Sequence, residues 1–251
     1  MARRKPATTH GIAVVDKPPG VTSHDVVGLL RRRFGERQVG HAGTLDPDAT
    51  GVLVVAVGKA TRLLRFVEKT RKGYTGEIVL GAATSTLDDS GDVLATFDMA
   101  AVTLDDARRA VAEHLVGDIE QIPPMVSAIR VDGKRLHELA REGIEIERVP
   151  RPVTIHRFDV DDWAAPGVLR VDVECSAGTY IRTLADDLGR LLGGGAHLRN
   201  LRRTNVGAFT LAEAAPPDEC DLLPVASAVR SLASVTVDDD IAVLIANGRV
   251  L

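Results

Sequence analysis

Apolar and polar residues alternate in several short stretches of the chain, and this period of two predicts β-strands. The alternation is clearest over residues 168–175 (VLRVDVEC), where the apolar residues face inward and the charged residues face outward. Residues 72–81 (KGYTGEIVLG) alternate in the same way and place Tyr74 and Ile78 on one face. Residues 52–57 (VLVVAV) form a continuous apolar run, which is typical of a strand buried on both faces.

Apolar residues at helical spacing predict helices between these strands. Ser23 is expected to cap a helix that ends at Gly35, because serine accepts hydrogen bonds from a first turn and glycine readily ends a helix. Thr103 and Asp106 have the pattern of a capping box, which predicts the start of a second helix. A third helix is expected after Gly178, with these residues on its apolar face: Ile181, Leu184, Leu188 and Leu191.

Composition narrows the class of protein. The chain has 251 residues, 45 % of them hydrophobic, so it can bury a substantial core as one large domain or two smaller ones. Its two cysteines, Cys175 and Cys220, are too few and too far apart for a disulfide framework or a cysteine-based zinc site, which suits a reducing cytoplasm. No apolar run approaches the roughly 18 residues that cross a membrane, and the N-terminus lacks the apolar stretch of a signal peptide.

The formal net charge is −4, which at first argues against a nucleic-acid partner. The acidic excess, however, lies in the tail. From Glu213 onward there are seven acidic residues against two basic ones, which leaves 29 basic and 28 acidic residues in the first 212. Local basic patches, rather than the global sum, decide whether a polyanion can dock, so the charge distribution permits RNA.

The stretch with the most chemistry is residues 40–51, which read GHAGTLDPDATG. Asp46 stands before Pro47, and a residue before proline is pushed toward extended geometry, so this carboxylate has little freedom to enter a helix. The glycines at both ends permit backbone conformations or close approaches that a side chain would forbid. The same residue types also make ordinary turns. On the residues alone, both a catalytic loop and a plain turn remain open.

This loop resembles the catalytic loop of the TruB family of pseudouridine synthases, whose pattern is close to GHxGTLDPxAxG. Further segments resemble the family in the same order along the chain, and the resemblance covers roughly residues 10–215. These segments are VVDKPPGVTSHDVV (14–27), KGYTGEIVLG (72–81), TSTLDDSG (84–91), PPMVSAIRVDGKRLHELAREG (123–143), CSAGTYIRTLADDLG (175–189) and GGGAHLRNLRRTNVG (193–207).

The resemblance implies a mixed α/β (α+β) pseudouridine-synthase catalytic domain, built on a central, largely antiparallel sheet flanked by helices and loops. This domain is expected over residues 1–221, with a charged RNA-gripping insertion at about 122–150. The Pro-rich, acidic stretch at 214–221 is expected to be a linker, and residues 222–251 resemble the opening of an incomplete C-terminal PUA-like module.

The implied reaction is isomerisation of uridine to pseudouridine in the TΨC loop of tRNA, at position 55. It needs no cofactor and no metal, and the chain has no nucleotide-binding glycine fingerprint and no HExxH pair. The partner is tRNA, through its TΨC arm, and no membrane partner is expected. A cytoplasmic monomer is expected.

The resemblance also assigns residues. Asp46 is the expected catalytic carboxylate, either as nucleophile or as base, with Arg182 as its partner and Tyr74 as the aromatic that stacks on the flipped base. Asp48 stands at a variable position and is expected to be exposed. The remaining expected contacts to the substrate are Gly43, Thr44, His41, Tyr180 and Leu201, with Lys17, Arg202 and Arg203 at phosphates.

Each of these residues also has a structural interpretation. Tyr74 alone reads as a core aromatic, His41 as a hydrogen-bonded structural histidine, and Arg182 as the surface partner of Asp186 one helical turn away. The chain departs from the family at His137 and Val126, where aromatics are common, and at Gln38, where a basic residue is frequent. These departures bear on RNA affinity more than on chemistry.

Two other functions compete with the isomerase. An RNA-folding chaperone would bind tRNA without needing the combination of Asp46, Tyr74 and Arg182. A metal-dependent hydrolase would use His41, Asp46 and Asp48, and its activity would be lost in excess chelator.

Overall fold

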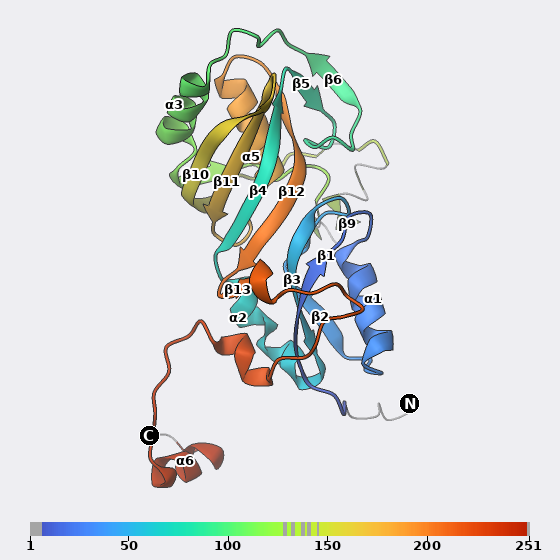
Figure 1. Ribbon diagram of the computed structural model, residues 1–251, viewed down its shortest axis with the longest axis vertical. Coiled ribbons are helices and arrows are strands. Elements are labelled where there is room, and N and C mark those ends of the chain that lie inside the picture. The colour runs from blue at the N-terminus through green and yellow to red at the C-terminus, as the bar shows by residue number, and fades with distance from the viewer. Residues whose placement is uncertain are drawn as a thin grey trace.

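The computed structural model describes residues 7–249 apart from 128–129, 132–133, 137–138, 140–141 and 145. One large sheet runs through the body of the molecule, in the strand order β1-β3-β12-β4-β11-β10-β7, with β2 beside β3 and β13 beside β12 (Figure 1). Its strands are β1 Gly11–Lys17, β2 Val39–Ala42, β3 Thr50–Val57, β4 Lys72–Leu80, β7 Gly117–Gln121, β10 Arg151–Ala165, β11 Val168–Cys175, β12 Ala196–Val206 and β13 Phe209–Thr210.

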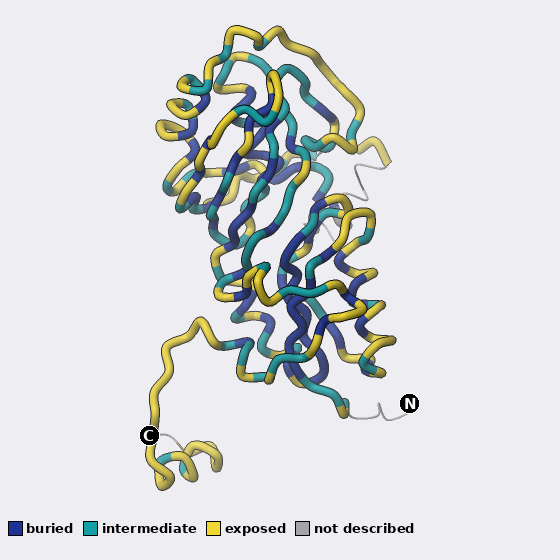
Figure 2. The backbone as a smooth tube through the Cα atoms, viewed as in Figure 1, coloured by how far each residue is buried: buried dark blue, intermediate teal, exposed yellow. Residues whose placement is uncertain are grey.

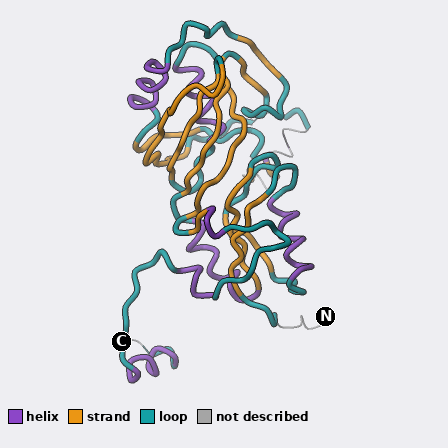
Figure 3. Tube along the Cα trace, in the orientation of Figure 1, coloured by secondary structure: helices purple, strands orange, loops and turns teal. Residues whose placement is uncertain are grey.

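Helices flank this sheet, as Figure 3 shows, and two small hairpins lie outside it. Helices α1 and α2 pack beside β2, whereas α3 packs on β10 and α5 on β12. The helices are α1 Ser23–Arg33, α2 Leu64–Glu68, α3 Leu104–His114, α5 Ile181–Leu191 and α6 Asp239–Ala246, with 3-10 turns at η1 Gly58–Leu63, η2 Leu211–Glu213 and η3 Val225–Val229. The hairpins pair β5 Ala82–Thr84 with β6 Val93–Thr96, and β8 Arg130–Val131 with β9 Lys134–Arg135.

Among the described strands the sheet is antiparallel except where β3 runs parallel to β12. The predicted mixed fold with a largely antiparallel sheet is therefore confirmed. The strands predicted at 72–81 and 168–175 are β4 and β11, which pair in register, with Tyr74 opposite Val173. Both positions belong to the same buried core.

The sheet is buried on both faces at its β1–β3 end, which explains the continuous apolar run of β3. Successive residues of β3 point to opposite faces, and Leu53 and Val55 join the core beneath α1 while Val52 and Val54 join the core beneath α2. Figure 2 shows the β1–β3 end of the sheet as buried and the outer faces of the helices as exposed. A strand covered on two sides needs no polar residue, so it loses the alternation that marks β11.

Two details of the predicted helices are wrong. Thr22, not Ser23, caps α1: its side chain accepts from the Asp25 N–H while the Asp25 carboxylate accepts from the Thr22 N–H. Ser23 is already inside the helix and buried. Leu191 does not join the apolar face of α5, because it is 44 % exposed at the last turn. The capping box of α3 at Thr103 is confirmed.

The chain beyond residue 214 first returns to the sheet and then leaves it. Leu223 exchanges backbone hydrogen bonds with Ile12 at 2.8 and 3.0 Å, and Ala228 in η3 is buried. Helix α6 has no buried residue, and Figure 2 shows it as mostly exposed. The insertion expected at 122–150 falls partly outside the described residues, His137 included. None of the described helices combines the length and the apolar character that crossing a bilayer would require.

Candidate active site

A pocket opens where four parts of the fold meet: the loop between β2 and β3, the neighbouring strands β4 and β12, the start of α5, and the loop that follows β7. Eight of the eleven predicted site residues line it; Lys17, His41 and Arg202 do not. The lining residues are Gly43, Thr44, Leu45, Asp46, Lys72, Tyr74, Ser127, Gly178, Thr179, Tyr180, Ile181, Arg182, Leu201 and Arg203.

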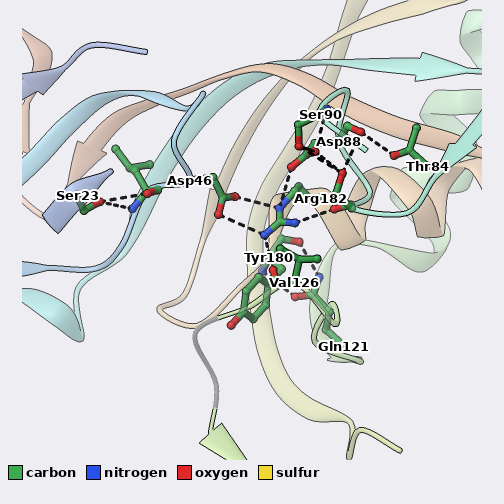
Figure 4. A network of polar contacts seen from close by, with 11 residues as sticks. Ser23, Asp46, Thr84, Asp88, Ser90, Gln121, Val126, Tyr180 and Arg182 are labelled. Atoms are coloured by element: carbon green, nitrogen blue, oxygen red, sulfur yellow. Dashed lines mark hydrogen bonds and ion pairs between the residues drawn. The ribbon is translucent and has the colours of Figure 1, made fainter. Parts of the chain in front are cut away.

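Asp46 and Arg182 form a two-point ion pair across this pocket. Arg182 Nε lies 3.0 Å from one Asp46 carboxylate oxygen, and an Arg182 Nη donates to the other at 3.3 Å. Figure 4 shows the guanidinium facing the carboxylate edge-on. This fork geometry fixes both the distance and the plane of the carboxylate. The alternative partner of Arg182 is excluded by position, because Asp186 pairs instead with Arg190 at 2.8 Å.

Arg182 is 4 % exposed, and its remaining donors are also engaged. One Nη donates to the Thr86 carbonyl at 2.7 Å, and the other donates to the Val126 carbonyl at 2.9 Å. A buried cation is tolerated only when it is paired and hydrogen-bonded. The guanidinium therefore joins three segments that are far apart in sequence: the Asp46 loop, the loop after β5 and the loop after β7.

A second carboxylate, Asp88, approaches the same guanidinium nitrogen, 3.6 Å from Arg182 Nε. It accepts hydrogen bonds from the Ser90 N–H at 3.1 Å and from the hydroxyls of Ser90 and Thr86 at 2.6 and 2.5 Å. These donors stabilise its charge independently of Arg182. The cation is thus shared between Asp88, which accepts these three hydrogen bonds on one oxygen, and Asp46, which faces the pocket (Figure 4).

The pKa of Asp46 reflects this competition. Its desolvation inside the pocket raises the pKa above the ordinary value for aspartate, Arg182 opposes that rise, and the nearby charge of Asp88 adds to it. The side chain is still 42 % exposed, so water reaches the carboxylate. The result is a carboxylate less strongly solvated than a surface aspartate, and such a group is more reactive when it is ionised.

The loop that carries Asp46 is held by a lysine that was predicted to bind phosphate. Lys17 is fully buried, and its ammonium donates to the carbonyls of Pro18, Val21 and Pro47 at 2.9, 2.7 and 2.8 Å. Burial lowers its pKa to about 8. Because all three ammonium donors are used on backbone, Lys17 does not fit a phosphate contact. It stabilises the turn directly after Asp46 instead.

Ser23 holds the same loop from the other side. Its hydroxyl accepts from the Leu45 N–H at 2.9 Å and donates to the Leu45 carbonyl at 3.1 Å. Leu45 is itself buried. The residues immediately before and after Asp46 are therefore both anchored, which leaves its side chain as the part of the loop that faces the pocket.

Arg203 is the second basic residue whose predicted phosphate contact does not fit. It is 1 % exposed, and it donates to the carbonyls of Val52 and Gly43 at 2.7 and 3.1 Å. Gly43 and Gly51 lie against it: an added Cβ would lie 3.5 Å from the Arg203 guanidinium at Gly43 and 2.2 Å from the Arg203 carbonyl at Gly51, and both glycines have positive φ. Arg203 therefore forms the floor of the pocket.

Tyr74 lies against that floor. It is 7 % exposed and lines the pocket, so it is both a core aromatic and a pocket residue. Burial raises the pKa of its phenol, with Arg203 acting in the opposite direction. The phenol is neutral at physiological pH. Its ring is available for stacking and its hydroxyl for hydrogen bonding.

Leu201 reaches the pocket because β12 bulges there. Three residue steps of β12, from Arg199 to Arg202, lie opposite two steps of β4, and Asn200 takes a left-handed φ of 52°. Glu77 secures the bulge by accepting from Arg199 and Asn200 at 2.7 and 3.0 Å. A bulge re-aims the side chains next to it, and here it turns Leu201 toward Asp46.

Some of the remaining predicted residues line the pocket and others lie outside it. Thr44 and Tyr180 line the pocket. Arg202 lies outside it and donates to Asp16 at 2.7 Å. His41 lies in β2, where burial and the Arg203 charge lower the pKa of its imidazole. Asp48 is exposed, as expected.

Sequence reasoning missed several residues of the site. Asp88 lay within a segment that was matched to the family, but its role was not assigned; the adjacent Thr86 and Ser90 were the available signal. Lys72 lines the pocket on the same face of β4 as Tyr74, and its ammonium donates to the carbonyls of Glu68 and Thr70. The described residues contain no cluster of three or more His, Cys, Asp or Glu that could hold a metal ion.

Residues 31–181 match the family described as TruB family pseudouridylate synthase (N terminal domain), and residues 182–220 match tRNA pseudouridylate synthase B C-terminal domain. The chain belongs to the TruB family. The junction between the two matches falls at Arg182, so the ion pair with Asp46 joins the two matched parts. Membership of this family makes the chain an isomerase of the pseudouridylate synthase type.

Individual relatives agree with this membership. The chain is 49 % identical over 246 residues to tRNA pseudouridine synthase B of Symbiobacterium thermophilum, covering 95 % of this chain and 82 % of that one. It is 52 % identical over 231 residues to the protein of the same name from an Arthrobacter species, covering 88 % and 75 %. A third relative of that name, from Corynebacterium glutamicum strain R, is 53 % identical over 216 residues, covering 84 % and 72 %.

Solved structures show the same fold. A crystal structure of a Cbf5–Nop10–Gar1 complex matches with a TM-score of 0.72 and 28 % identity, over 95 % of this chain and 67 % of that one. A structure of an H/ACA RNP bound to a substrate RNA containing 2′-deoxyuridine matches with a TM-score of 0.64 and 26 % identity, over 88 % and 61 %.

Proposed function

We propose that this TruB-family isomerase converts a uridine in the TΨC loop of tRNA to pseudouridine, with Asp46 as the catalytic carboxylate. The observation that carries the proposal is the two-point ion pair of Asp46 with Arg182 at the edge of a pocket that Tyr74 and Leu201 also line. The tRNA substrate is supported by relatives about half identical that are named tRNA pseudouridine synthase B.

The reaction exchanges one glycosidic bond for another. The bond between N1 of uracil and C1′ of the sugar breaks, the base turns, and C5 bonds to C1′. C5 loses its proton and N1 gains one, so the product is an isomer and no redox partner is consumed. Release of the C5 proton to water is therefore a direct measure of the reaction.

Asp46 supplies the one ionised group that this exchange requires. As a nucleophile, its oxygen bonds to C1′ while N1 leaves with the electron pair, and the later attack of C5 on C1′ frees the carboxylate. As a base, it removes a sugar proton next to C1′ and returns it afterward. In both cases Arg182 holds the carboxylate in its ionised form and in a fixed plane.

The target base must leave its stack to reach this pocket. Tyr74 offers an aromatic face on the pocket floor, and Leu201 an apolar contact from the bulge of β12. Flipped bases are commonly held by aromatic stacking and by hydrogen bonds to their edges. The neutral phenol of Tyr74 can stack without introducing a charge next to the uracil.

We place the catalytic unit at residues 1–221, the RNA-gripping insertion at about 122–150, and a separate C-terminal segment at 222–251. Arg199, whose side chain is about one third exposed beside Leu201, is a better-placed phosphate contact than Lys17 or Arg203, which bind backbone carbonyls. We propose that the chain acts as a monomer and without a metal. We propose the cytoplasm as its location, because tRNA is found there.

The test is tritium release from tRNA transcripts labelled at C5 of uridine. Wild-type protein is expected to release tritium from the TΨC-loop uridine, and excess chelator should not change the rate. Asp46→Asn should reduce release by about 10⁴-fold or more, because it removes the group proposed as nucleophile or base at the sugar. The variant should still bind tRNA.

Asp48→Asn is the matched control, since it removes an exposed carboxylate two residues away. It is expected to leave release unchanged. A wild-type protein that rescues tRNA folding but releases no tritium would instead support the chaperone. A transcript whose TΨC-loop uridine is replaced by cytidine should release nothing if the proposed position is correct.

A further inference from the structure

The side chain of Gln121 is bonded to the main chain of a pocket residue. Gln121 is the last residue of β7 and is 2 % exposed. Its amide oxygen accepts from the Tyr180 N–H at 2.7 Å, and its amide nitrogen donates to the Tyr180 carbonyl at 3.1 Å. Figure 4 shows the two residues side by side below Arg182. One side chain thus satisfies both polar groups of one backbone unit, as a neighbouring β-strand would.

Tyr180 stands at a sensitive point, because it is the N-cap of α5 and lies two residues before Arg182. No side chain caps α5 there, and the Tyr180 carbonyl is shared between Gln121 and the Leu184 N–H, which donates at 3.3 Å. The backbone of Tyr180 therefore sets where the first turn of the helix begins. The direction of the Arg182 side chain follows from that turn.

The strand that ends at Gln121 also provides a second hold on the same arginine. Five residues later the Val126 carbonyl accepts from an Arg182 Nη at 2.9 Å. The segment 121–126 thus touches both the backbone that carries Arg182 and its guanidinium. That guanidinium in turn meets Asp46 at 3.0 Å.

We propose that Gln121 is a positioning residue for the isomerisation: its amide fixes the backbone of Tyr180 and thereby aims Arg182 at Asp46. This inference rests on the proposed function. Gln121 does not line the pocket and touches no reacting atom. Its effect is therefore on the rate of the chemical step and not on the affinity for RNA.

The alternative is that Gln121 only fills space in the core. Gln121→Met distinguishes the two, because methionine has a similar length and loses both hydrogen bonds, whereas Gln121→Ala loses the bonds and the volume. Positioning predicts that both variants are slow. Simple packing predicts that only the alanine variant is affected.

The experiment measures single-turnover tritium release from C5-labelled tRNA at saturating enzyme, and tRNA affinity by filter binding, well below the unfolding temperature of each variant. Gln121→Met and Gln121→Ala are expected to react about 10-fold or more slowly, since a small misplacement of a catalytic group costs up to about 100-fold. Their dissociation constants for tRNA should stay within about twofold of wild type.

Gln121→Asn gives a graded result. It keeps the amide but is one methylene shorter, so both hydrogen bonds to Tyr180 lengthen, and its rate is expected between those of wild type and Gln121→Met. It also carries the test if the methionine and alanine variants do not fold.

Two control variants separate position from stability. Asp118→Ala, on the same strand as Gln121, removes the hydrogen bond that Asp118 accepts from Thr154 of β10 and leaves both hydrogen bonds of Tyr180 in place. Thr103→Ala removes the cap of α3 and destabilises the protein at a distance from the pocket. Both should keep the wild-type rate at temperatures where they are folded.

A Gln121→Met variant that reacts at the wild-type rate would overturn the inference. So would rates and tRNA affinities that fall together, which would mean that Gln121 acts on RNA binding. A wild-type protein that releases no tritium would instead overturn the proposed function, so the two failures are distinguishable.

Discussion

The two walls of the pocket are anchored in different ways. The Asp46 wall, residues 43–49, is held by side chains that bind its backbone: Ser23 binds Leu45 on one side of Asp46 and Lys17 binds Pro47 on the other. The Arg182 wall, residues 180–182, is held at its backbone by Gln121 and at its charged end by Asp88 and two carbonyls.

This difference follows from the chemistry of each wall. A loop that presents one carboxylate needs only a rigid main chain, and fixed backbone bonds supply it. A buried guanidinium has five donors that must all be satisfied, so its own side chain gathers acceptors from several segments. The comparison predicts that damage to the Arg182 wall acts first on catalysis, whereas damage to the Asp46 wall acts on stability and catalysis together.

Replacing Arg182 should have the largest effect after Asp46 itself. Arg182→Met leaves Asp46 and Asp88 without their shared cation and is expected to lower single-turnover tritium release by about 10²- to 10³-fold. Arg182→Lys should lose less, because it keeps the charge and loses the two-point geometry. Equal rates for the two variants would show that the positive charge by itself contributes nothing and that the two-point geometry carries the effect.

The pH dependence sharpens this prediction. Catalysis needs Asp46 ionised, so activity is expected to fall as the pH drops through the raised pKa of that carboxyl. Arg182 opposes the rise, so in Arg182→Lys, where the cation is held less closely, the acidic limb of the pH–rate profile should move to higher pH. The charges of Asp88 and Lys17 also act on Asp46. If the acidic limb of the pH–rate profile did not move in Arg182→Lys, the group that titrates would not be Asp46.

Lys17→Met should reduce stability most among changes to the Asp46 wall. It leaves three carbonyls without their donor, each at a cost of about 1–3 kcal/mol when it stays buried. Denaturant unfolding measures the loss, and tritium release should fall about 10-fold because Pro47 is no longer held. A Lys17→Met variant as stable as wild type would show that the Lys17 ammonium does not hold these three carbonyls.

The pH dependence of this stability difference has a defined sign. The pKa of Lys17 is lowered from 10.5 to about 8 in the folded chain. Between those values the unfolded chain holds a proton that the folded chain has lost, so raising the pH favours folding. The stability of wild type relative to Lys17→Met should therefore increase as the pH rises from 8 to 10.5.

Ser23→Ala and Thr22→Ala form a matched pair of adjacent changes with a smaller effect. Thr22→Ala removes the cap of α1 and should cost about 1 kcal/mol of stability without changing the rate. Ser23→Ala removes both bonds to Leu45 and should cost a similar amount while slowing tritium release about threefold or more. Equal rates for the two variants would show that the hydrogen bonds between Ser23 and Leu45 do not position Asp46.

The smallest effect is expected at Arg190, the partner that Asp186 takes in place of Arg182. The Arg190 side chain is 71 % exposed whereas that of Asp186 is 9 % exposed, so water screens the pair from the arginine side and its loss is expected to cost about 1 kcal/mol or less. Arg190→Gln should therefore leave both the unfolding midpoint and the rate of tritium release near wild type. A large rate loss would mean that Asp186 matters for the first turn of α5.

Much of the site could be predicted because its motifs are local. Residues 40–51 place Asp46 on a stiff loop before a buried strand, and β3 and β4 follow from apolar patterns of a few residues. Periodicity is a property of neighbours in sequence, so it also predicted β11 and the apolar face of α5 up to Leu188. It failed at Leu191, where the helix extends past the core that buries its earlier turns.

The partners of the basic residues could not be predicted in this way. Lys17 and Arg203 were predicted at phosphates, but each donates to a backbone carbonyl at least 30 positions away. The partner of Arg182 was predicted only through the family resemblance. A long flexible side chain carries no local signal of which acceptor it will reach. Ser23 misled for the same reason, since its hydroxyl could cap its own helix or bind Leu45, and only packing brought Leu45 within reach.

The sequence by itself determined the family, the mixed fold with a largely antiparallel sheet, and the loop that presents Asp46, because these depend on composition, periodicity and contiguous motifs. Through the family resemblance the sequence also named Arg182 as the partner of Asp46, and the structure has that pair. Only the tertiary structure decided which cations are used on backbone carbonyls, and that Asp88 and Gln121 complete the surroundings of Arg182. The physical reason is that burial forces every charge to find a partner, and that partner is chosen by distance in space rather than along the chain.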